Sequence, residues 1–335
     1  MQKKIIYNEI TLIKVLATLF ITWFHFKWTV PQNFAPLFIG GAIGNSLFFY
    51  ASGHLLKFKE ERFYGQWIVG KIIRLLPSIW VFYTLTLLLF PDRMNIAWYN
   101  FFYPTTFWFV NCILCYFLIM FLLKGKLSVP VSAEQNVNKT HRGGVNKTLL
   151  IIGLLSLSLH ISYYFLYVDH HQIVIDDGSI KSWSFYFIFF LWGYYDRINP
   201  KTYKGNLKSV FVFCLSIGLF YGYKKIGGQN EMMIFLQFLL IPLLLANAIR
   251  STLHLASYLI TFNTPQWFKT ICGHLSNWTL DIYIVQVFII NLTMPHIPFP
   301  LNVGIVFTLI LLAAYVNNYC ARKISNVLNR IILRI

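Results

Sequence analysis

The stretch "TLIKVLATLFITWFHFKW", residues 11–28, decides the fold because it is apolar enough to cross a membrane. Comparable apolar blocks recur along the 335-residue chain, with the length of about 20 residues that a helix needs to span a bilayer core. Hydrophobic residues make up 57% of the sequence and charged residues only 12%, against roughly 25% charged in a typical soluble domain. The sequence therefore predicts an all-α, polytopic membrane helical bundle with about ten transmembrane helices.

The predicted spans are separated by polar or basic segments. They cover about 9–28, 36–56, 73–90, 101–123, 148–168, 183–197, 208–223, 231–249, 272–292 and 302–321. One further stretch, "STLHLASYLITFNTPQWF" at 251–268, has two interpretations: an interfacial helix or an additional span.

The formal net charge of +17 follows the predicted topology. If the N-terminus is cytoplasmic, most Lys and Arg residues fall on the cytoplasmic side, several of them in the polar loop at 124–148. This positive-inside pattern predicts cytoplasmic termini and an even number of spans. We therefore expect the lipid bilayer, and not a nucleic acid, as the partner of the basic residues. Residues 1–335 are expected to form one integral-membrane domain, with the loop at 124–148 between spans four and five.

Two short patterns bear on metal or redox chemistry, and both are weak. Cys112 and Cys115 form a C-x-x-C within an apolar span, without a second pair. The predicted outer loop, 167–183, gathers Asp169, His170, His171, Asp176 and Asp177. A polar loop between spans is usually only solvated, so a sugar contact there is a weak interpretation and a metal site a weaker one. We expect no metal.

Lys14 and His25 stand eleven residues apart inside the opening stretch. A Lys within a bilayer costs at least about 2.5 kcal/mol, so its presence needs a reason. Eleven residues correspond to about 16 Å of helical rise and about three turns, so both side chains project from one face. They either line a common route, or Lys14 snorkels to the headgroups while His25 is a satisfied core histidine.

The second span ends in "GNSLFFYASGHLL", residues 44–56. A Ser-Gly pair in an apolar run, here Ser52 and Gly53, permits close approach of another helix. The functional alternative is that Ser52 and His54 line a cavity.

The third span opens with "KIIRLLPSIW", residues 71–80, in which Lys71 and Arg74 are three residues apart. That spacing places both cations on one helix face. They are either anchors at the membrane surface or a site for phosphates, which paired basic side chains bind.

Taken in order, these segments resemble the membrane acyltransferase-3 family. The resemblance covers nearly the whole chain, and its five motifs are "K-x10-H" at 14–25, "LFFYASGHLL", "KIIRLLPSIW", "FWFVNCILCYFL" at 107–118 and "SNWTLDIYIVQVFI" at 276–289. It implies a protein of ten spans that O-acylates sugars or other hydroxyl compounds.

The resemblance assigns roles position by position. His25 matches the membrane histidine of the family, and Lys14 stands where the family has an Arg. Lys keeps the charge of Arg but lacks its bidentate fork. Lys71 and Arg74 match a basic pair at the start of the third span. Thr11 departs from the family, which often has an acidic residue at that place.

The other motifs match in part. The matched residues are Phe48, Phe49, Ser52 and Gly53 in the second span, Trp108 and Phe109 in the fourth, and Tyr283 in the ninth. Ser46 stands where an Asp is common, and Gln286 stands where a His is frequent. We expect a lining of the substrate route by His54, Trp108, Tyr283 and Gln286.

The resemblance implies an O-acetyltransferase of a bacterial plasma membrane. Cytoplasmic acetyl-CoA, or another acyl-CoA, would be the donor, with no permanently bound cofactor, and a cell-surface or lipid-linked saccharide would be the acceptor. His25 would act as the general base or carry the acyl group transiently. Ser52 would orient the reacting groups, and Lys14, Lys71 and Arg74 would hold the phosphates of the donor.

An exporter or flippase of a glycan or amphiphile is the alternative. Transporters of the common kinds show internal repeats or paired broken helices, and the sequence shows neither pattern. A membrane component that has lost activity is a third interpretation, which the departures at Thr11, Ser46 and Gln286 leave open.

Overall fold

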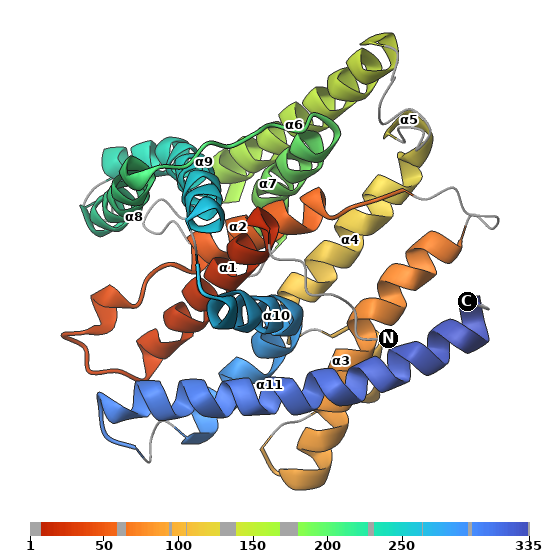
Figure 1. Ribbon diagram of the computed structural model, residues 1–335, viewed down its shortest axis with the longest axis vertical. Coiled ribbons are helices and arrows are strands. Elements are labelled where there is room, and N and C mark those ends of the chain that lie inside the picture. Colours follow the sequence, from red (N-terminus) through yellow and green to blue (C-terminus); the bar gives the residue numbers. More distant parts are fainter. Residues whose placement is uncertain are drawn as a thin grey trace. The chain divides into compact units, whose positions relative to one another are not determined.

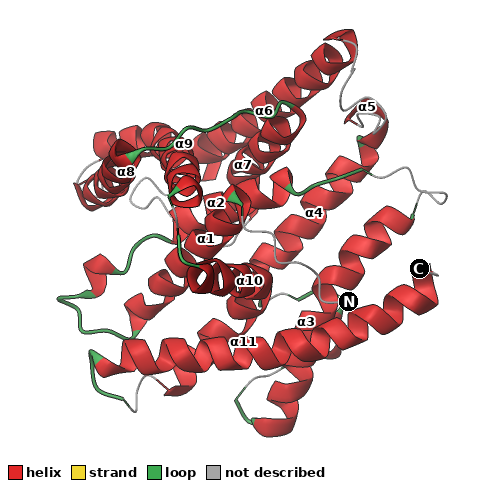
Figure 2. Ribbon diagram, viewed as in Figure 1, coloured by secondary structure: helices red, strands yellow, loops and turns green. Residues whose placement is uncertain are grey.

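The computed structural model describes residues 8–58, 65–93, 96–104, 106–127, 139–167, 180–226, 231–262, 264–293 and 297–333. Throughout these ranges the regular secondary structure is helical, and Figure 2 shows helices joined by loops with no strand in the described part of the chain. The predicted all-α class is confirmed.

The helices follow the predicted spans closely (Figure 1). The first part of the chain forms α1 (Glu9–His25), α2 (Gly41–His54), α3 (Gln66–Leu89), α4 (Trp108–Leu122), the short α5 (Lys124–Leu127) and α6 (Lys139–Tyr167). The rest forms α7 (Ile180–Ile198), α8 (Leu207–Ile226), α9 (Glu231–Thr261), α10 (Gln266–Thr293) and α11 (Leu301–Leu328). The stretch 251–268 is not a separate element, because α9 continues to Thr261 and α10 begins at Gln266.

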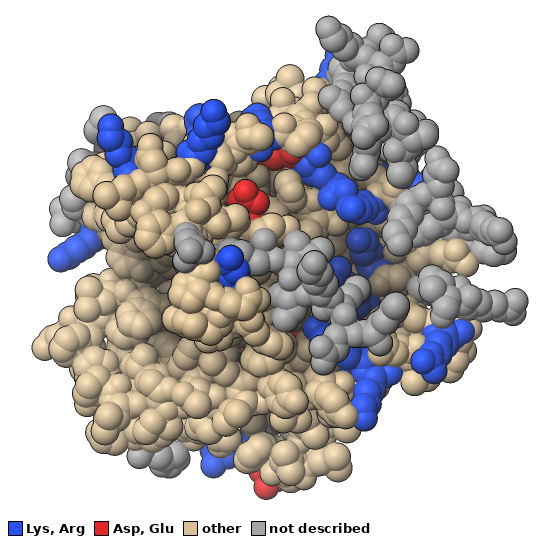
Figure 3. All heavy atoms as spheres, viewed as in Figure 1, with Lys and Arg blue, Asp and Glu red and all other residues tan. Residues whose placement is uncertain are grey.

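The chain is a multi-pass membrane protein. Among the described residues, six helical segments are long and apolar enough to cross a membrane: Glu9–Trp28, Gln66–Leu89, Gly144–Ser162, Leu240–Thr261, Gln266–Thr293 and Leu301–Ile332. Two shorter apolar helices, Trp108–Leu122 and Leu207–Tyr223, accompany them. On the face drawn in Figure 3, blue Lys and Arg side chains are far more frequent than red Asp and Glu side chains, as the net charge requires.

The helices group into two compact units. The first comprises residues 1–28, 32–56 and 150–279, and the second comprises residues 29–31, 57–149 and 280–335. The first unit therefore holds α1, α2, the larger part of α6, α7, α8, α9 and the beginning of α10. The second holds α3, α4, α5, the beginning of α6, the end of α10 and α11.

Small residues let α2 approach its neighbours in the first unit. A Cβ atom on Gly44 would overlap the carbonyl oxygen of Ala17 on α1. A Cβ atom on Gly53 would overlap the carbonyl oxygen of Phe190 on α7 in the same way. The backbones of these helices thus touch, and the predicted role of Gly53 in close helix approach is confirmed.

In the second unit, α3 and α11 pack together and are joined by two hydrogen bonds. The Ser325 hydroxyl donates to the carbonyl oxygen of Ile73 over 3.0 Å. The Asn317 side-chain amide donates to the carbonyl oxygen of Ser78, also over 3.0 Å. From the first of these bonds to the second, the residue number rises on α3, from 73 to 78, and falls on α11, from 325 to 317. The two helices are therefore antiparallel.

Candidate functional site

His25 is the last residue of α1, and aromatic contacts fix the end of that helix. The Trp23 indole nitrogen donates to the carbonyl oxygen of Leu37 over 2.8 Å, and the Trp23 ring stacks on Phe38 with centroids 4.3 Å apart. The Phe24 ring meets the His25 imidazole edge to face at 5.6 Å. These contacts order the backbone on which the imidazole is mounted.

The His25 ring itself is only partly buried. In contrast to its neighbour Trp23, it forms no hydrogen bond with any residue that the structure describes. An imidazole nitrogen can accept a proton or donate one. The end of α1 that carries His25 is thus held in place by its neighbours, while the ring nitrogens of His25 form no hydrogen bond with a described residue.

Lys14 precedes His25 by eleven residues on α1, and its side chain contacts another helix. Its ammonium donates to the carbonyl oxygen of Ser276 on α10. The Thr279 hydroxyl donates to the same carbonyl over 3.0 Å. This contact satisfies a charge inside an apolar helix and fastens α1 to α10.

Thr11, which departs from the family pattern, forms a capping box with Asn8, the N-cap residue of α1. Its backbone N–H donates to the side-chain oxygen of Asn8 over 3.0 Å, and its hydroxyl accepts from the backbone N–H of Asn8 over 3.4 Å. Such a reciprocal capping box satisfies N–H groups that otherwise lack partners in the first turn of a helix. The departure from the family pattern at Thr11 thus has a local structural role.

Ser52 and His25 lie at opposite ends of the α1–α2 pair. A Cβ atom on Gly41 would press on the Phe24 ring, and one on Gly44 would press on Ile21, so α1 and α2 are antiparallel. Ser52 follows Gly41 by eleven residues, about 16 Å of helical rise. The structure thus places Ser52 near the beginning of α1 and not beside the imidazole of His25.

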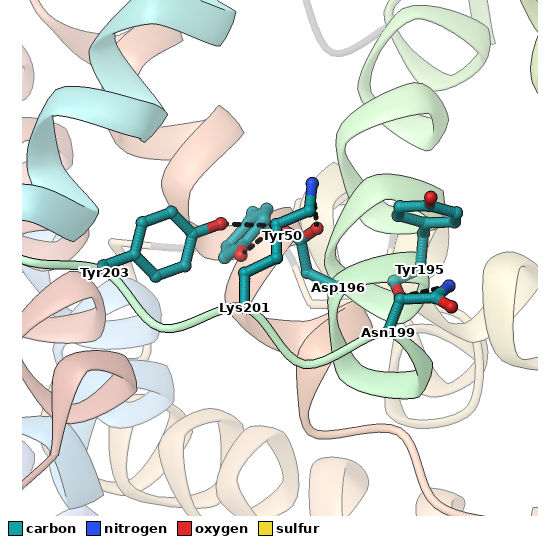
Figure 4. Close-up of polar contacts among 6 residues, drawn as sticks. All are labelled: Tyr50, Tyr195, Asp196, Asn199, Lys201 and Tyr203. Atoms are coloured by element: carbon teal, nitrogen blue, oxygen red, sulfur yellow. Dashed lines mark hydrogen bonds and ion pairs between the residues drawn. The ribbon is translucent and has the colours of Figure 1, made fainter.

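A buried carboxylate lies close to this end of α2. Asp196, near the end of α7, accepts hydrogen bonds from the hydroxyls of Tyr50 and Tyr203, each over 2.9 Å. The Lys201 ammonium is 3.4 Å from its other oxygen, and Figure 4 shows the carboxylate between these three groups. Burial, followed by the charge of Asp196, raises the pKa of Tyr203 to about 12. The Tyr203 hydroxyl therefore remains a donor at neutral pH.

His54 borders the same cluster. Its ring stacks on Tyr50 with centroids 6.2 Å apart. Its carbonyl oxygen accepts from the Arg197 guanidinium over 3.1 Å, which caps the end of α2. The Nδ1 atom of His54 is buried and has no hydrogen-bond partner within the described ranges. Its predicted place on the substrate route stays a prediction.

The basic pair of the third span lies in the second unit. The Lys71 ammonium stands over the Trp67 ring at 5.1 Å and over the Phe117 ring at 5.3 Å. These cation–π contacts orient the ammonium next to α4. Arg74 is exposed and forms no ion pair with a described residue.

The predicted lining residues of the second unit form an aromatic group. The Tyr283 ring lies 5.2 Å from Phe109 and 6.3 Å from Phe107, and the Trp108 ring meets Phe109 edge to face. Gln286 is fully buried, three residues after Tyr283 on α10. The structure thus brings the motifs of the fourth and ninth spans together.

A second buried carboxylate, Asp281, is a polar residue that the sequence analysis did not single out. The carboxylate accepts from the side-chain amides of Asn317 and Asn318, over 2.7 and 2.6 Å. Because Asn317 also donates to Ser78, the group links α3, α10 and α11. An ionisable residue in the middle of "TLDIYIV" was the signal that could have found it.

The predicted site residues are thus divided between the units. The first unit holds Lys14, His25, Ser52 and His54, and the second holds Lys71, Arg74, Trp108, Tyr283 and Gln286. The residues Asp169, His170, His171, Asp176 and Asp177 lie outside the described ranges. Within those ranges, no group of three or more His, Cys, Asp or Glu residues is arranged to hold a metal ion.

Comparison with known proteins identifies the family. A family model described as an acyltransferase domain matches residues 7–317, a range that includes every predicted site residue. No curated protein and no solved structure matches the chain. The family match and the long apolar helices agree with the order of motifs from Lys14 to Gln286. The chain belongs to the acyltransferase-3 family and is an integral-membrane acyltransferase.

Proposed function

We propose that the protein moves an acetyl group from cytoplasmic acetyl-CoA to a hydroxyl of a cell-surface or lipid-linked saccharide, in a bacterial plasma membrane. The observation that carries the proposal is the state of His25. Its neighbours Trp23 and Phe24 are held by aromatic contacts and a hydrogen bond, while its own ring nitrogens have no partner within the described residues. A general base requires this combination of fixed position and open nitrogen.

In the proposed reaction, a ring nitrogen of His25 takes the proton of the acceptor hydroxyl. The acceptor oxygen attacks the thioester carbonyl carbon, a C–O bond forms, and the C–S bond to coenzyme A breaks. The proton on His25 then passes to the leaving thiolate, so that the products are the O-acetyl ester and free coenzyme A. No net proton is gained or lost.

The donor carries phosphates, which we assign to the basic residues. Lys71 and Arg74 lie toward the beginning of α3, on the cytoplasmic side under the proposed topology. Lys14 adds a positive charge on the same face of α1 as His25. Ser52 lies near the beginning of α1, whereas His25 ends that helix. We therefore assign Ser52 to a part of the donor between its phosphates and its thioester, and not to the reacting carbonyl.

The test is mass spectrometry of envelope glycans from cells that lack the protein. The cells are complemented with wild type, His25→Ala or His274→Ala at matched membrane levels. His274 is an exposed histidine whose ring rests on Trp278, so it serves as the matched control. We expect the acetyl mass to return with wild type and His274→Ala, and to be lost by at least about a hundredfold with His25→Ala.

Two results would contradict the proposal. Equal acetylation with His25→Ala would show that His25 is not the base. Loss of surface glycan in the deletion strain, without any change in acetylation, would instead support an exporter or flippase.

A further inference from the structure

Arg322 on α11 stands opposite Arg74 on α3. The two hydrogen bonds between these antiparallel helices pair Ile73 with Ser325 and Ser78 with Asn317. Arg322 lies between Asn317 and Ser325 on α11, so the same register sets it against the turn of α3 that carries Arg74. Both helices can be followed in Figure 1, where α11 crosses α3.

The electrostatics agree with this register. The charge of Arg322 acts on Arg74 as a repulsion between like charges. Both side chains are exposed, and neither forms a hydrogen bond or ion pair with a residue that the structure describes. The charge of Arg322 also acts on the nearby Asp281 carboxylate, which accepts from the amides of Asn317 and Asn318 and forms no ion pair with either guanidinium. The fold thus holds two guanidinium groups together without a contacting carboxylate.

We propose that Arg322 completes, with Lys71 and Arg74, a site for a phosphate ester at the crossing of α3 and α11. Guanidinium groups bind phosphate through two parallel hydrogen bonds, and a phosphate between two of them relieves their repulsion. Lys71 adds a point charge that is already oriented by Trp67 and Phe117.

Two sources could supply the phosphate ester. One is the nucleotide part of the acyl-CoA donor, an assignment that rests on the proposed function. The other is the headgroup of an anionic phospholipid, because Arg322 is on a membrane-spanning helix. Coenzyme A carries a 3′-phosphate and a diphosphate, so the loss of one phosphate group can be tested chemically.

The neighbouring residue provides a matched control. Lys323 is also an exposed cation on α11, but its ammonium stands over the Tyr319 ring at 4.6 Å. Adjacent residues on a helix point in directions about 100° apart, so Lys323 does not share the face of Arg322. Lys323→Gln removes the same formal charge without removing the proposed contact.

The experiment measures binding of coenzyme A and of 3′-dephospho-coenzyme A to the full chain in nanodiscs of phosphatidylcholine. The variants are wild type, Arg322→Gln, Arg322→Lys and Lys323→Gln. Retention of phosphatidylglycerol by the same variants is measured by native mass spectrometry. For a donor site, we expect Arg322→Gln to weaken coenzyme A binding about ten- to a hundredfold, the value of a charged hydrogen bond. Arg322→Lys recovers part of the affinity, and Lys323→Gln resembles wild type.

Each outcome has one meaning. If Arg322→Gln weakens coenzyme A but weakens the dephospho form less, Arg322 contacts the 3′-phosphate. If only phosphatidylglycerol retention falls, the ligand is a lipid headgroup. If wild type binds coenzyme A, and Arg322→Gln binds coenzyme A and retains phosphatidylglycerol as well as wild type does, the inference is overturned while the proposed donor stands. If wild type does not bind coenzyme A at all, the proposed donor fails, and the lipid arm alone decides the role of Arg322.

Discussion

Asp196 in the first unit and Asp281 in the second are both almost fully buried, at 2% and 1% exposure, but different groups surround them. Asp196 accepts from two tyrosine hydroxyls and faces the ammonium of Lys201, which is 56% exposed. Asp281 accepts from the neutral amides of Asn317 and Asn318, and the Ser78 side chain also hydrogen-bonds to it. Asp196 thus pairs with an ammonium that reaches water, whereas the hydrogen bonds of Asp281 come from neutral side chains.

The difference follows from where each residue lies in its helix. Asp196 is in the last turn of α7, and the loop that follows supplies both Lys201 and Tyr203. Asp281 is in the middle of α10, inside a segment apolar enough to span the membrane. A buried charge needs several hydrogen bonds to be tolerated, and the partners of Asp281 on α10 come from α11 and from Ser78 on α3. The comparison teaches that the Asp281 carboxylate holds several helices together, whereas the Asp196 carboxylate holds the end of α7 and the loop that follows it.

The strongest test of this comparison is Asp281→Ala. Two buried amides would lose their acceptor, at about 1–3 kcal/mol each, so we expect a loss of about 2–6 kcal/mol in the free energy of unfolding. The measurement is reversible unfolding of the full chain in mixed micelles. Asp281→Asn keeps one acceptor oxygen and should lose about half as much. Wild-type stability of Asp281→Ala would show that Asn317 and Asn318 do not depend on this carboxylate.

The same measurement on Asp196→Ala should give a smaller loss, of about 1–2 kcal/mol. Only Tyr50 is fully buried there, whereas Lys201 can return to water. Asp196→Asn should lie close to wild type, because an amide oxygen still accepts from both tyrosines. A larger loss for Asp196→Ala than for Asp281→Ala would reverse the comparison.

The smallest effect is expected for Lys201→Ala. Its ion pair with Asp196 is 3.4 Å long and its side chain is largely solvated, so we expect about 0–1 kcal/mol. The difference from wild type should shrink further as the salt concentration rises. A loss that persists in high salt would show that the carboxylate of Asp196 depends on this cation, in which case the tyrosine hydroxyls are secondary.

The placement of the long helices could be predicted from the sequence because the length of each apolar block is set by the bilayer. The ends were less predictable. Residues 36–40 are apolar and were included in the second span, yet α2 begins only at Gly41. Hydropathy counts apolar residues whether or not they are helical. The close approach at Gly53 was predictable in kind, but its partner Phe190 was not, because it is distant in the sequence.

The candidate site was predictable only in part. The motifs that carry His25, Lys71 and Tyr283 can each be recognised locally. The links from Asp281 to Asn317 and from Lys14 to Ser276 depend on how helices that are distant in the sequence pack together, so no local sequence pattern predicts them. The capping function of Thr11 could have been read from Asn8 and Thr11, which have the spacing of a helix cap.

The contact between Gly53 on α2 and Phe190 on α7 also has a consequence for synthesis. Neither α2 nor α7 is among the described helices that are long and apolar enough to span a membrane, and the two pack against each other. Translation proceeds at about 5–20 residues per second, so roughly ten seconds separate the emergence of His54 from that of Ile180. During that interval the Gly53 face of α2 must be covered by lipid or by an insertion factor. The Ser-Gly motif of α2 is thus synthesised before α7, the helix against which Gly53 packs.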